Sequence, residues 1–178
     1  GSSQFASGLL IALAHAMDDT CTPAPAHLTV TGPIVSRPYL DMTLSLMRRF
    51  AVGYAETAEG EFDLTPRTGD SPVTVPVAGD WSQAAVLLCA GAVGQEVRVS
   101  NLLSEETCTQ GDAAIVEVLR QMGMTMEEKD GLLRAIRPAS GLAPIDLNCD
   151  NIPDIAPIIA LTCATIPGVS TLKGVARL

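Results

Sequence analysis

The sequence predicts an α+β fold built from a repeated unit of strands and helices. Three segments with the pattern of strands, "HLTVTG", "EVRVSN" and "VSTLKG", begin at residues 27, 96 and 169, which are 69 and 73 residues apart. The segments between these strands are predicted to contain the same elements in the same order. Such self-similarity is typical of repeat architectures. Hydrophobic residues make up 47% of the 178 residues and aromatic residues only 3%. The core is therefore expected to consist mainly of aliphatic side chains.

Five further elements are predicted between the first two strand segments. Leu40, Leu44, Met47 and Phe50 recur at helical spacing and predict an amphipathic helix, with Pro38 near its first turn. The elements that follow are a hairpin, a short strand and a second helix, over residues 52–66, 73–79 and 79–94. The predicted unit is thus strand–helix–strand–strand–strand–helix.

The second copy repeats this order. Asp112 is expected to cap its first helix and Gly123 to end that helix, while "DG" at Asp130-Gly131 is a strong hairpin signal. Its later elements are a hairpin, a short strand and a helix, over residues 124–138, 143–148 and 151–168. Residues 2–17 match the second helix of a unit. We therefore expect a fragment of a larger repeat protein; the alternative is a small natural domain with coincidental similarity.

Charge and hydropathy exclude several classes of partner. Acidic residues number 20 against 11 basic ones, for a net charge of -9, which argues against binding to nucleic acid or an anionic membrane surface. An anionic small molecule stays possible, because a few local donors can hold one. No apolar run reaches the length of a membrane span. Five cysteines without C-x-x-C spacing favour free thiols in a reducing cytosol, and with only two histidines we expect no metal site.

Five short motifs resemble the EPSP synthases, the 3-phosphoshikimate 1-carboxyvinyltransferases. They are "SSQF" at Ser2–Phe5, "SRPYLDMTL" at Ser36–Leu44, "GDWSQAA" at Gly79–Ala85, "QGD" at Gln110–Asp112 and "NIPDIA" at Asn151–Ala156. The resemblance covers essentially the whole chain and implies two similar domains, each of three β-α-β-α-β-β units, with the substrate cleft between them. Residues 1–77 would belong to the domain that binds shikimate 3-phosphate, and residues 78–178 to the second domain.

The resemblance also implies a reaction. Members of this family move the enolpyruvyl group of phosphoenolpyruvate onto the 5-hydroxyl of shikimate 3-phosphate, in the shikimate pathway to chorismate and the aromatic amino acids. The chemistry needs phosphate-binding groups, a base for the hydroxyl and an acid for the methylene carbon, but no cofactor. A cytoplasmic, monomeric parent enzyme would be expected.

Candidate binding residues lie at the starts of two predicted helices. Hydroxyls and backbone N–H groups at a helix start form a ready anion site. By resemblance, Ser2 and Ser3 hold the phosphate of shikimate 3-phosphate, Gln4 contacts substrate, Ser36 adds to the same phosphate site and Tyr39 packs near the ring. The alternative is plain helix capping by the serines and partial burial of Tyr39.

Asp154 is the candidate base. It stands at the start of an apolar helix, where the helix dipole favours a carboxylate, and by resemblance it takes the proton of the 5-hydroxyl. A helix cap is the alternative for Asp154 and the expected role of Asp80. Arg37, where family members often carry Lys, would be a solvated charge.

The Lys-Glu pair and the basic residues that the family uses for proton transfer and phosphoenolpyruvate would lie outside the chain. We therefore expect no appreciable synthase activity from these 178 residues alone. One alternative function is a UDP-N-acetylglucosamine enolpyruvyl transferase, which turnover with each acceptor would distinguish. Another is a non-catalytic repeat module that binds a phosphorylated ligand, which would lack the outlying catalytic residues.

Overall fold

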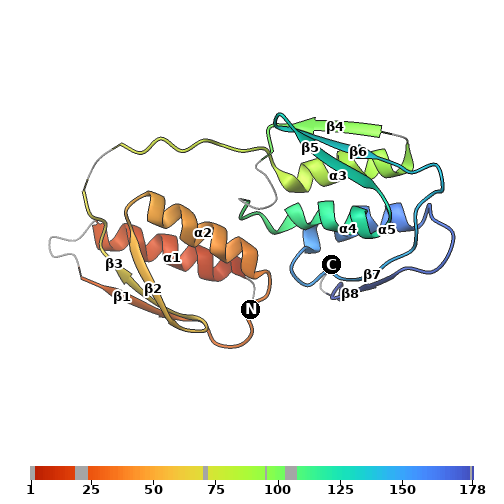
Figure 1. Cartoon of the computed structure of the whole chain (residues 1–178). Helices are drawn as coiled ribbons and strands as arrows, with labels where there is room; N and C mark the ends of the chain where they lie inside the picture. Colours follow the sequence, from red (N-terminus) through yellow and green to blue (C-terminus); the bar gives the residue numbers. More distant parts are fainter. Residues whose placement is uncertain (1–2, 19–23, 70–71, 95, 103–107, 177) are drawn as a thin grey trace. The chain divides into compact units, whose positions relative to one another are not determined.

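The chain was analysed as a computed structural model, which describes residues 3–18, 24–69, 72–94, 96–102, 108–176 and 178. It divides into two compact units, Gly1–Pro76 and Val77–Leu178. Each unit has its own cluster of buried hydrophobic residues. Figure 1 shows that each unit combines helices with small sheets, so the α+β prediction is confirmed.

Unit 1 packs two helices on one three-stranded sheet (Figure 1). Its elements, in chain order, are α1 (Ser3–Asp18), β1 (Ala26–Thr29), α2 (Arg37–Arg49), β2 (Gly53–Ala58) and β3 (Glu61–Thr65). The sheet order is β1-β3-β2, with both pairs antiparallel. Leu40, Leu44 and Met47 of the predicted stripe of α2 are buried against α1 and the sheet. Phe50, the fourth predicted member, is the C-cap residue of α2 and is 46% exposed.

Unit 2 repeats this sheet and adds a second, smaller one. Its first part comprises α3 (Trp81–Val93), β4 (Glu96–Ser100), the 3-10 turn η1 (Gly111–Ala114), α4 (Ile115–Gln121), β5 (Thr125–Lys129) and β6 (Leu132–Ile136). Its second part comprises β7 (Asp146–Asn148), the 3-10 turn η2 (Pro153–Ile155), α5 (Ala156–Cys163) and β8 (Thr171–Lys173). The order β4-β6-β5, again antiparallel, matches β1-β3-β2. The internal repeat is therefore present in the fold.

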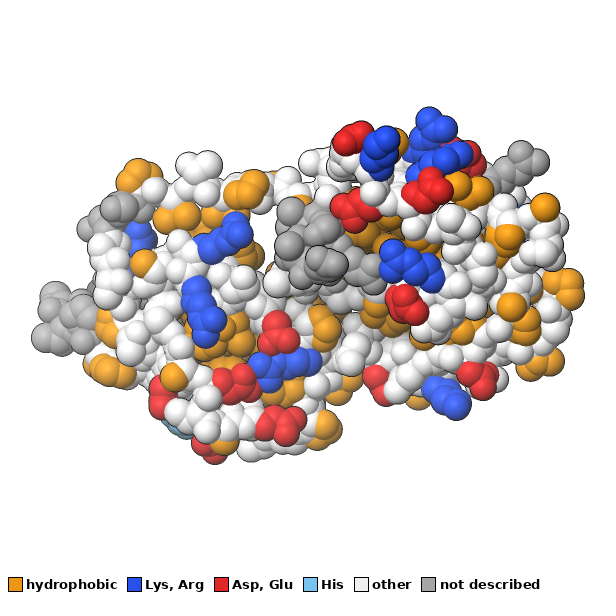
Figure 2. Space-filling model, viewed as in Figure 1, with side chains coloured by type: hydrophobic (Ala, Val, Ile, Leu, Met, Phe, Trp, Pro, Cys, Tyr) orange, Lys and Arg blue, Asp and Glu red, His pale blue; other side chains and the backbone are white. Residues whose placement is uncertain are grey.

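The hairpin predicted from "DG" is present between β5 and β6. Asp130 and Gly131 both have positive φ, 54° and 72°, as a two-residue type I′ connection requires. Figure 2 shows basic and acidic side chains interleaved over the outer face of the β4-β6-β5 sheet, where Arg98 and Arg134 both pair with Glu96.

Two local predictions are wrong. Residues 73–79 form no strand. Gly79 N–H bonds across to Asn101 O at 2.7 Å, whereas the equivalent β7 pairs with β8 over three residues. Asp112 does not occupy the N-cap of α4 either, since the 3-10 turn η1 precedes that helix and Ala114 is its N-cap.

The described cysteines carry free thiols: Cys89, Cys108, Cys149 and Cys163. None of the helices in the described ranges is long and apolar enough to cross a membrane. Among the same residues, no cluster of three or more His, Cys, Asp or Glu side chains is arranged to hold a metal ion.

Candidate functional site

The start of α1 carries two of the predicted binding residues. Ser3 is the first residue of the helix and is 2% exposed, whereas the next residue, Gln4, is exposed. Ser2 lies outside the described residues. Because the first N–H groups of a helix have no partner within it, the start of α1 offers backbone donors beside the Ser3 hydroxyl and the Gln4 amide.

The start of α2 carries the other two. Ser36 is its N-cap residue, 7% exposed, with a left-handed backbone at φ 58° and ψ 46°. Its side chain makes no capping hydrogen bond; instead, its carbonyl accepts from Tyr39 N–H at 3.1 Å. The Ser36 hydroxyl therefore does not act as the helix cap that was the alternative to phosphate binding. A serine in this conformation is uncommon and costs free energy, which makes the position a candidate for function.

These two helix starts lie at the same end of unit 1. Figure 1 shows α1 and α2 packed side by side and running in the same direction, and Thr43 Oγ1 of α2 donates to Ser7 Oγ of α1 at 2.9 Å. Ser3 stands one turn before Ser7, and Tyr39 stands one turn before Thr43. The structure thus brings Ser3, Gln4, Ser36 and Tyr39 to one end of the unit, where two helix dipoles favour an anion.

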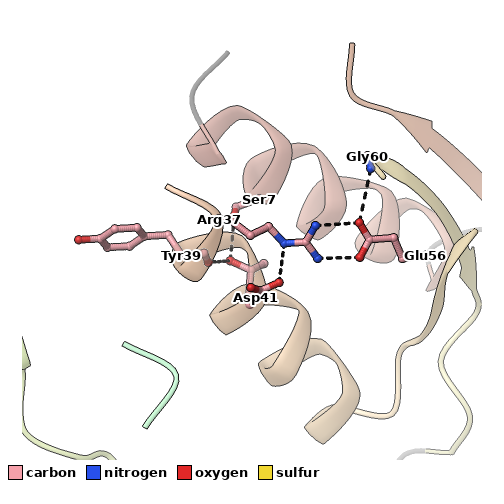
Figure 3. A network of polar contacts seen from close by, with 7 residues as sticks. Ser7, Arg37, Tyr39, Asp41, Glu56 and Gly60 are labelled. Carbon is pink, nitrogen blue, oxygen red and sulfur yellow. Dashed lines mark hydrogen bonds and ion pairs between the residues drawn. The ribbon is translucent and has the colours of Figure 1, made fainter. Parts of the chain in front are cut away.

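Tyr39 is half-buried and its side chain leaves the helix beside Ser7 (Figure 3). Its ring points away from the polar network drawn around Arg37, while its backbone carbonyl accepts from Thr43 Oγ1 at 3.1 Å. This exposure leaves the ring able to contact a ligand as well as neighbouring apolar groups.

Arg37 makes three hydrogen bonds at the start of α2, so it is more than a solvated charge. Its two terminal nitrogens donate to the two carboxylate oxygens of Glu56, at 2.8 and 2.6 Å, and its Nε donates to Asp41 Oδ1 at 2.7 Å (Figure 3). The hydrogen bonds from Arg37 lower the pKa of Glu56 below its usual value. The Arg37–Asp41 contact follows from i,i+4 spacing, but nothing in the sequence around Glu56 indicates its partner.

Asp154 lies in unit 2. It is the middle residue of the 3-10 turn η2 and is exposed, while its neighbour Ile155 is buried. The N-cap positions of η2 and α5 are Ile152 and Ile155, so Asp154 does not occupy the cap position of either. A solvent-facing carboxylate just before an apolar helix can accept a proton from a bound hydroxyl.

Asp80 occupies the corresponding place before α3 and is a cap, as expected. Its carboxylate accepts from Ser82 N–H at 2.9 Å. Ser82 Oγ donates to Asp112, and Gln110 bridges the same helix start, accepting from Trp81 N–H and donating to Gly79 O. The polar side chains at the start of α3 are therefore committed to holding the chain itself.

Solved structures with this fold include an EPSP synthase and an enolpyruvyl transferase. EPSP synthase from Acinetobacter baumannii superposes with a TM-score of 0.60 and 21% identity, over 85% of this chain and 35% of that one. The enolpyruvyl transferase NikO from Streptomyces tendae superposes with a TM-score of 0.60 and 16% identity, over 85% of this chain and 36% of that one. At such identities the likeness defines the fold class.

The sequence comparison identifies the family. The EPSP synthase (3-phosphoshikimate 1-carboxyvinyltransferase) family model matches residues 1–178, and the chain belongs to this family. Relatives named 3-phosphoshikimate 1-carboxyvinyltransferase include those of Methanocorpusculum labreanum, 37% identical over 99% of this chain, and Nitrosomonas europaea, 36% identical over 98%. The chain spans about 39% of the length of each of these relatives.

Proposed function

We propose that this chain is part of an enzyme that transfers the enolpyruvyl group of phosphoenolpyruvate to the 5-hydroxyl of shikimate 3-phosphate. The observation that carries the proposal is the family match over all 178 residues, together with the paired helix starts of unit 1. The products would be 5-enolpyruvylshikimate 3-phosphate and inorganic phosphate. The enzyme would act in the cytoplasm as a monomer, in the biosynthesis of chorismate and aromatic amino acids.

Unit 1 would bind the phosphorylated acceptor. Ser2, Ser3 and Ser36 would donate their hydroxyls, with backbone N–H groups, to the phosphate of shikimate 3-phosphate, while Gln4 and Tyr39 would contact its ring. Hydrogen bonds to a phosphate oxygen are charge-assisted and stronger than neutral ones. The burial of Ser3 and Ser36 would further strengthen them, because water competes less for a buried donor. On this proposal residues 1–77 form part of the acceptor domain.

Unit 2 would supply the base, and residues 78–178 would form part of the second domain. Asp154 would take the proton of the 5-hydroxyl as that oxygen bonds to the carbon bearing the phosphate of phosphoenolpyruvate, while the methylene carbon is protonated. Loss of phosphate and of a methyl proton from this adduct would then restore the double bond. The exposed position of Asp154 supports the proposal, because a base must reach its substrate.

Phosphate release from phosphoenolpyruvate tests the proposal. The full-length enzyme containing residues 1–178 is expected to release phosphate with shikimate 3-phosphate as acceptor and not with UDP-N-acetylglucosamine. The chain of 178 residues alone is expected to release none. Release with the nucleotide sugar, or no release with either acceptor, would contradict the proposal, and the second outcome would favour a non-catalytic binding module.

A further inference from the structure

Arg37 links the start of α2 to the β2–β3 hairpin. It is the first residue of α2, directly after Ser36, and its guanidinium holds Glu56 of β2 through two parallel bonds (Figure 3). Its side chain is 33% exposed and that of Glu56 is 26% exposed. Bidentate pairs of this kind fix geometry as well as adding energy. The pair therefore restrains the residue beside Ser36.

The hairpin tip also holds the other end of the segment that leads to Ser36. Val30 N–H donates to Gly60 O at 2.8 Å, and a Cβ at Gly60, whose φ is +79°, would come within 2.8 Å of Val30 O. Glu56 Oε1 accepts a longer bond from Gly60 N–H at 3.4 Å. Contacts thus run in a closed ring from Val30 through residues 31–36 to Arg37, on to Glu56, and back through Gly60.

Ser36 needs such restraint because its backbone is in an unfavourable region. Left-handed geometry is unfavourable for a non-glycine residue, and a hydroxyl placed to meet a phosphate must be held closely to be effective. We propose that Arg37 and Glu56 are positioning residues that hold Ser36 in this conformation at the phosphate end of unit 1. This inference rests on the proposed function for its ligand, but its structural part can be tested without it.

The charges argue against a direct bond from Arg37 to the phosphate. One guanidinium touches two carboxylates, those of Glu56 and Asp41, so the cluster carries a net charge of about −1 at neutral pH. A phosphate at the guanidinium would meet both carboxylates at close range. Arg37 therefore acts through Ser36, and not as the cation of the site.

Unit 2 offers a matched control. Arg134 forms a comparable bidentate pair, in which its Nε and Nη2 donate to Glu96 at 2.9 Å each, while its Nη1 donates to Glu127 at 3.1 Å. Those residues belong to β4, β5 and β6, and none of them is a cap or first-turn residue of a helix. Arg134→Met therefore removes an equivalent network without touching the proposed phosphate end.

The first test is amide exchange in the 178-residue chain. Tyr39 N–H, bonded to Ser36 O, is expected to exchange about tenfold faster in Arg37→Met and Glu56→Gln, with core amides of β3 unchanged. Asp41→Asn, which leaves the bidentate pair intact, and Arg134→Met are expected to leave Tyr39 exchange within about twofold. Unchanged exchange in Arg37→Met and Glu56→Gln would overturn the inference, whatever the enzyme does.

The second test is kinetic and uses the full-length enzyme. Arg37→Met and Glu56→Gln are both expected to raise KM for shikimate 3-phosphate about tenfold, with kcat unchanged, because loss of uniform binding appears in KM alone. Arg37→Lys, which keeps the charge but not the fork, is expected to behave like Arg37→Met. Arg134→Met is expected to leave KM unchanged.

The direction of the change in KM for Glu56→Gln distinguishes a positioning role of Arg37 from direct binding of the phosphate by Arg37. If Arg37 bound the phosphate directly, releasing it from Glu56 would lower KM, and Arg37→Lys would keep it. Either result would overturn the positioning role. A wild-type enzyme without turnover would instead count against the proposed function, and the exchange test would still decide whether the pair holds Ser36.

Discussion

The two units repeat one sheet but begin their central helices differently. Both sheets have the same strand order, and each unit has a forked arginine network. In unit 1 this network stands beside the left-handed Ser36 at the start of α2; in unit 2 it lies on the sheet, and α4 begins through the 3-10 turn η1. Similar interactions can thus hold the strands of a sheet together in unit 2 and, as proposed above, position a functional group in unit 1.

The largest expected difference is between substitutions of the two aspartates that precede α3 and α5, Asp80 and Asp154. Asp154→Asn in the full-length enzyme is expected to lower kcat by about 10²–10⁴, the usual contribution of a general base, with little change in the free energy of unfolding. Asp80→Ala is expected to lower the free energy of unfolding by about 1 kcal/mol through loss of its cap. Steady-state kinetics and urea denaturation check the pair. A kcat within tenfold of wild type for Asp154→Asn would contradict the proposed base.

Two helical glycines test how tightly each unit is packed. A Cβ at Gly91 of α3 would lie 2.7 Å from Val97 Cγ1, whereas one at Gly8 of α1 would meet nothing within 4 Å. Gly91→Ala is expected to destabilise the chain by about 1–3 kcal/mol through overpacking. Gly8→Ala is expected to stabilise it by about 0.5–1 kcal/mol through helix propensity. Thermal unfolding measures both effects. Shifts of Tm in the same direction for the two variants would contradict the difference in packing between Gly91 and Gly8.

Ser36 tests the strain assigned to unit 1. Ser36→Gly should relieve the left-handed backbone and raise the free energy of unfolding by about 1 kcal/mol, while it removes the hydroxyl and weakens binding of the acceptor. Asp130→Gly, at another left-handed position, φ 54°, should gain less, because aspartate tolerates this conformation better. Denaturant titration measures the free energy of unfolding of both variants. An equal increase in the two would argue against special strain at Ser36.

The smallest expected effect concerns acid. Pairing with Arg134 and Arg98 lowers the pKa of Glu96 from 4.5 to about 2. A carboxylate whose pKa is lowered by folding stabilises the folded state at pH values above its pKa in the unfolded chain. This stabilisation is lost as the pH falls through its pKa in the folded state. Glu96→Gln should therefore flatten the fall in unfolding free energy between pH 4.5 and about 2. An acid branch identical to that of wild type would show that this exposed pair contributes nothing.

Much of the fold follows from local pattern. The periodicity of Leu40 and Leu44, and the Asp130-Gly131 turn, predict elements that the structure contains. The absent strand at 73–79 shows where pattern fails, because the residues there alternate as in a strand but form no ladder. In the site, motifs predict which residues matter, and helix pairing then gathers Ser3 and Ser36. The partner of Arg37 was not predictable, because Glu56 is 19 residues away and only the sheet brings it near.

The most direct test of the account is titration of the 178-residue chain with shikimate 3-phosphate, followed by amide chemical shifts. Chemical-shift changes are expected to concentrate at Ser3, Gln4, Ser36 and Tyr39, and inorganic phosphate is expected to reproduce those at the serines but not at Tyr39. Shifts confined to unit 2, or no shifts at millimolar ligand, would contradict the assignment of the acceptor site to the paired helix starts of unit 1.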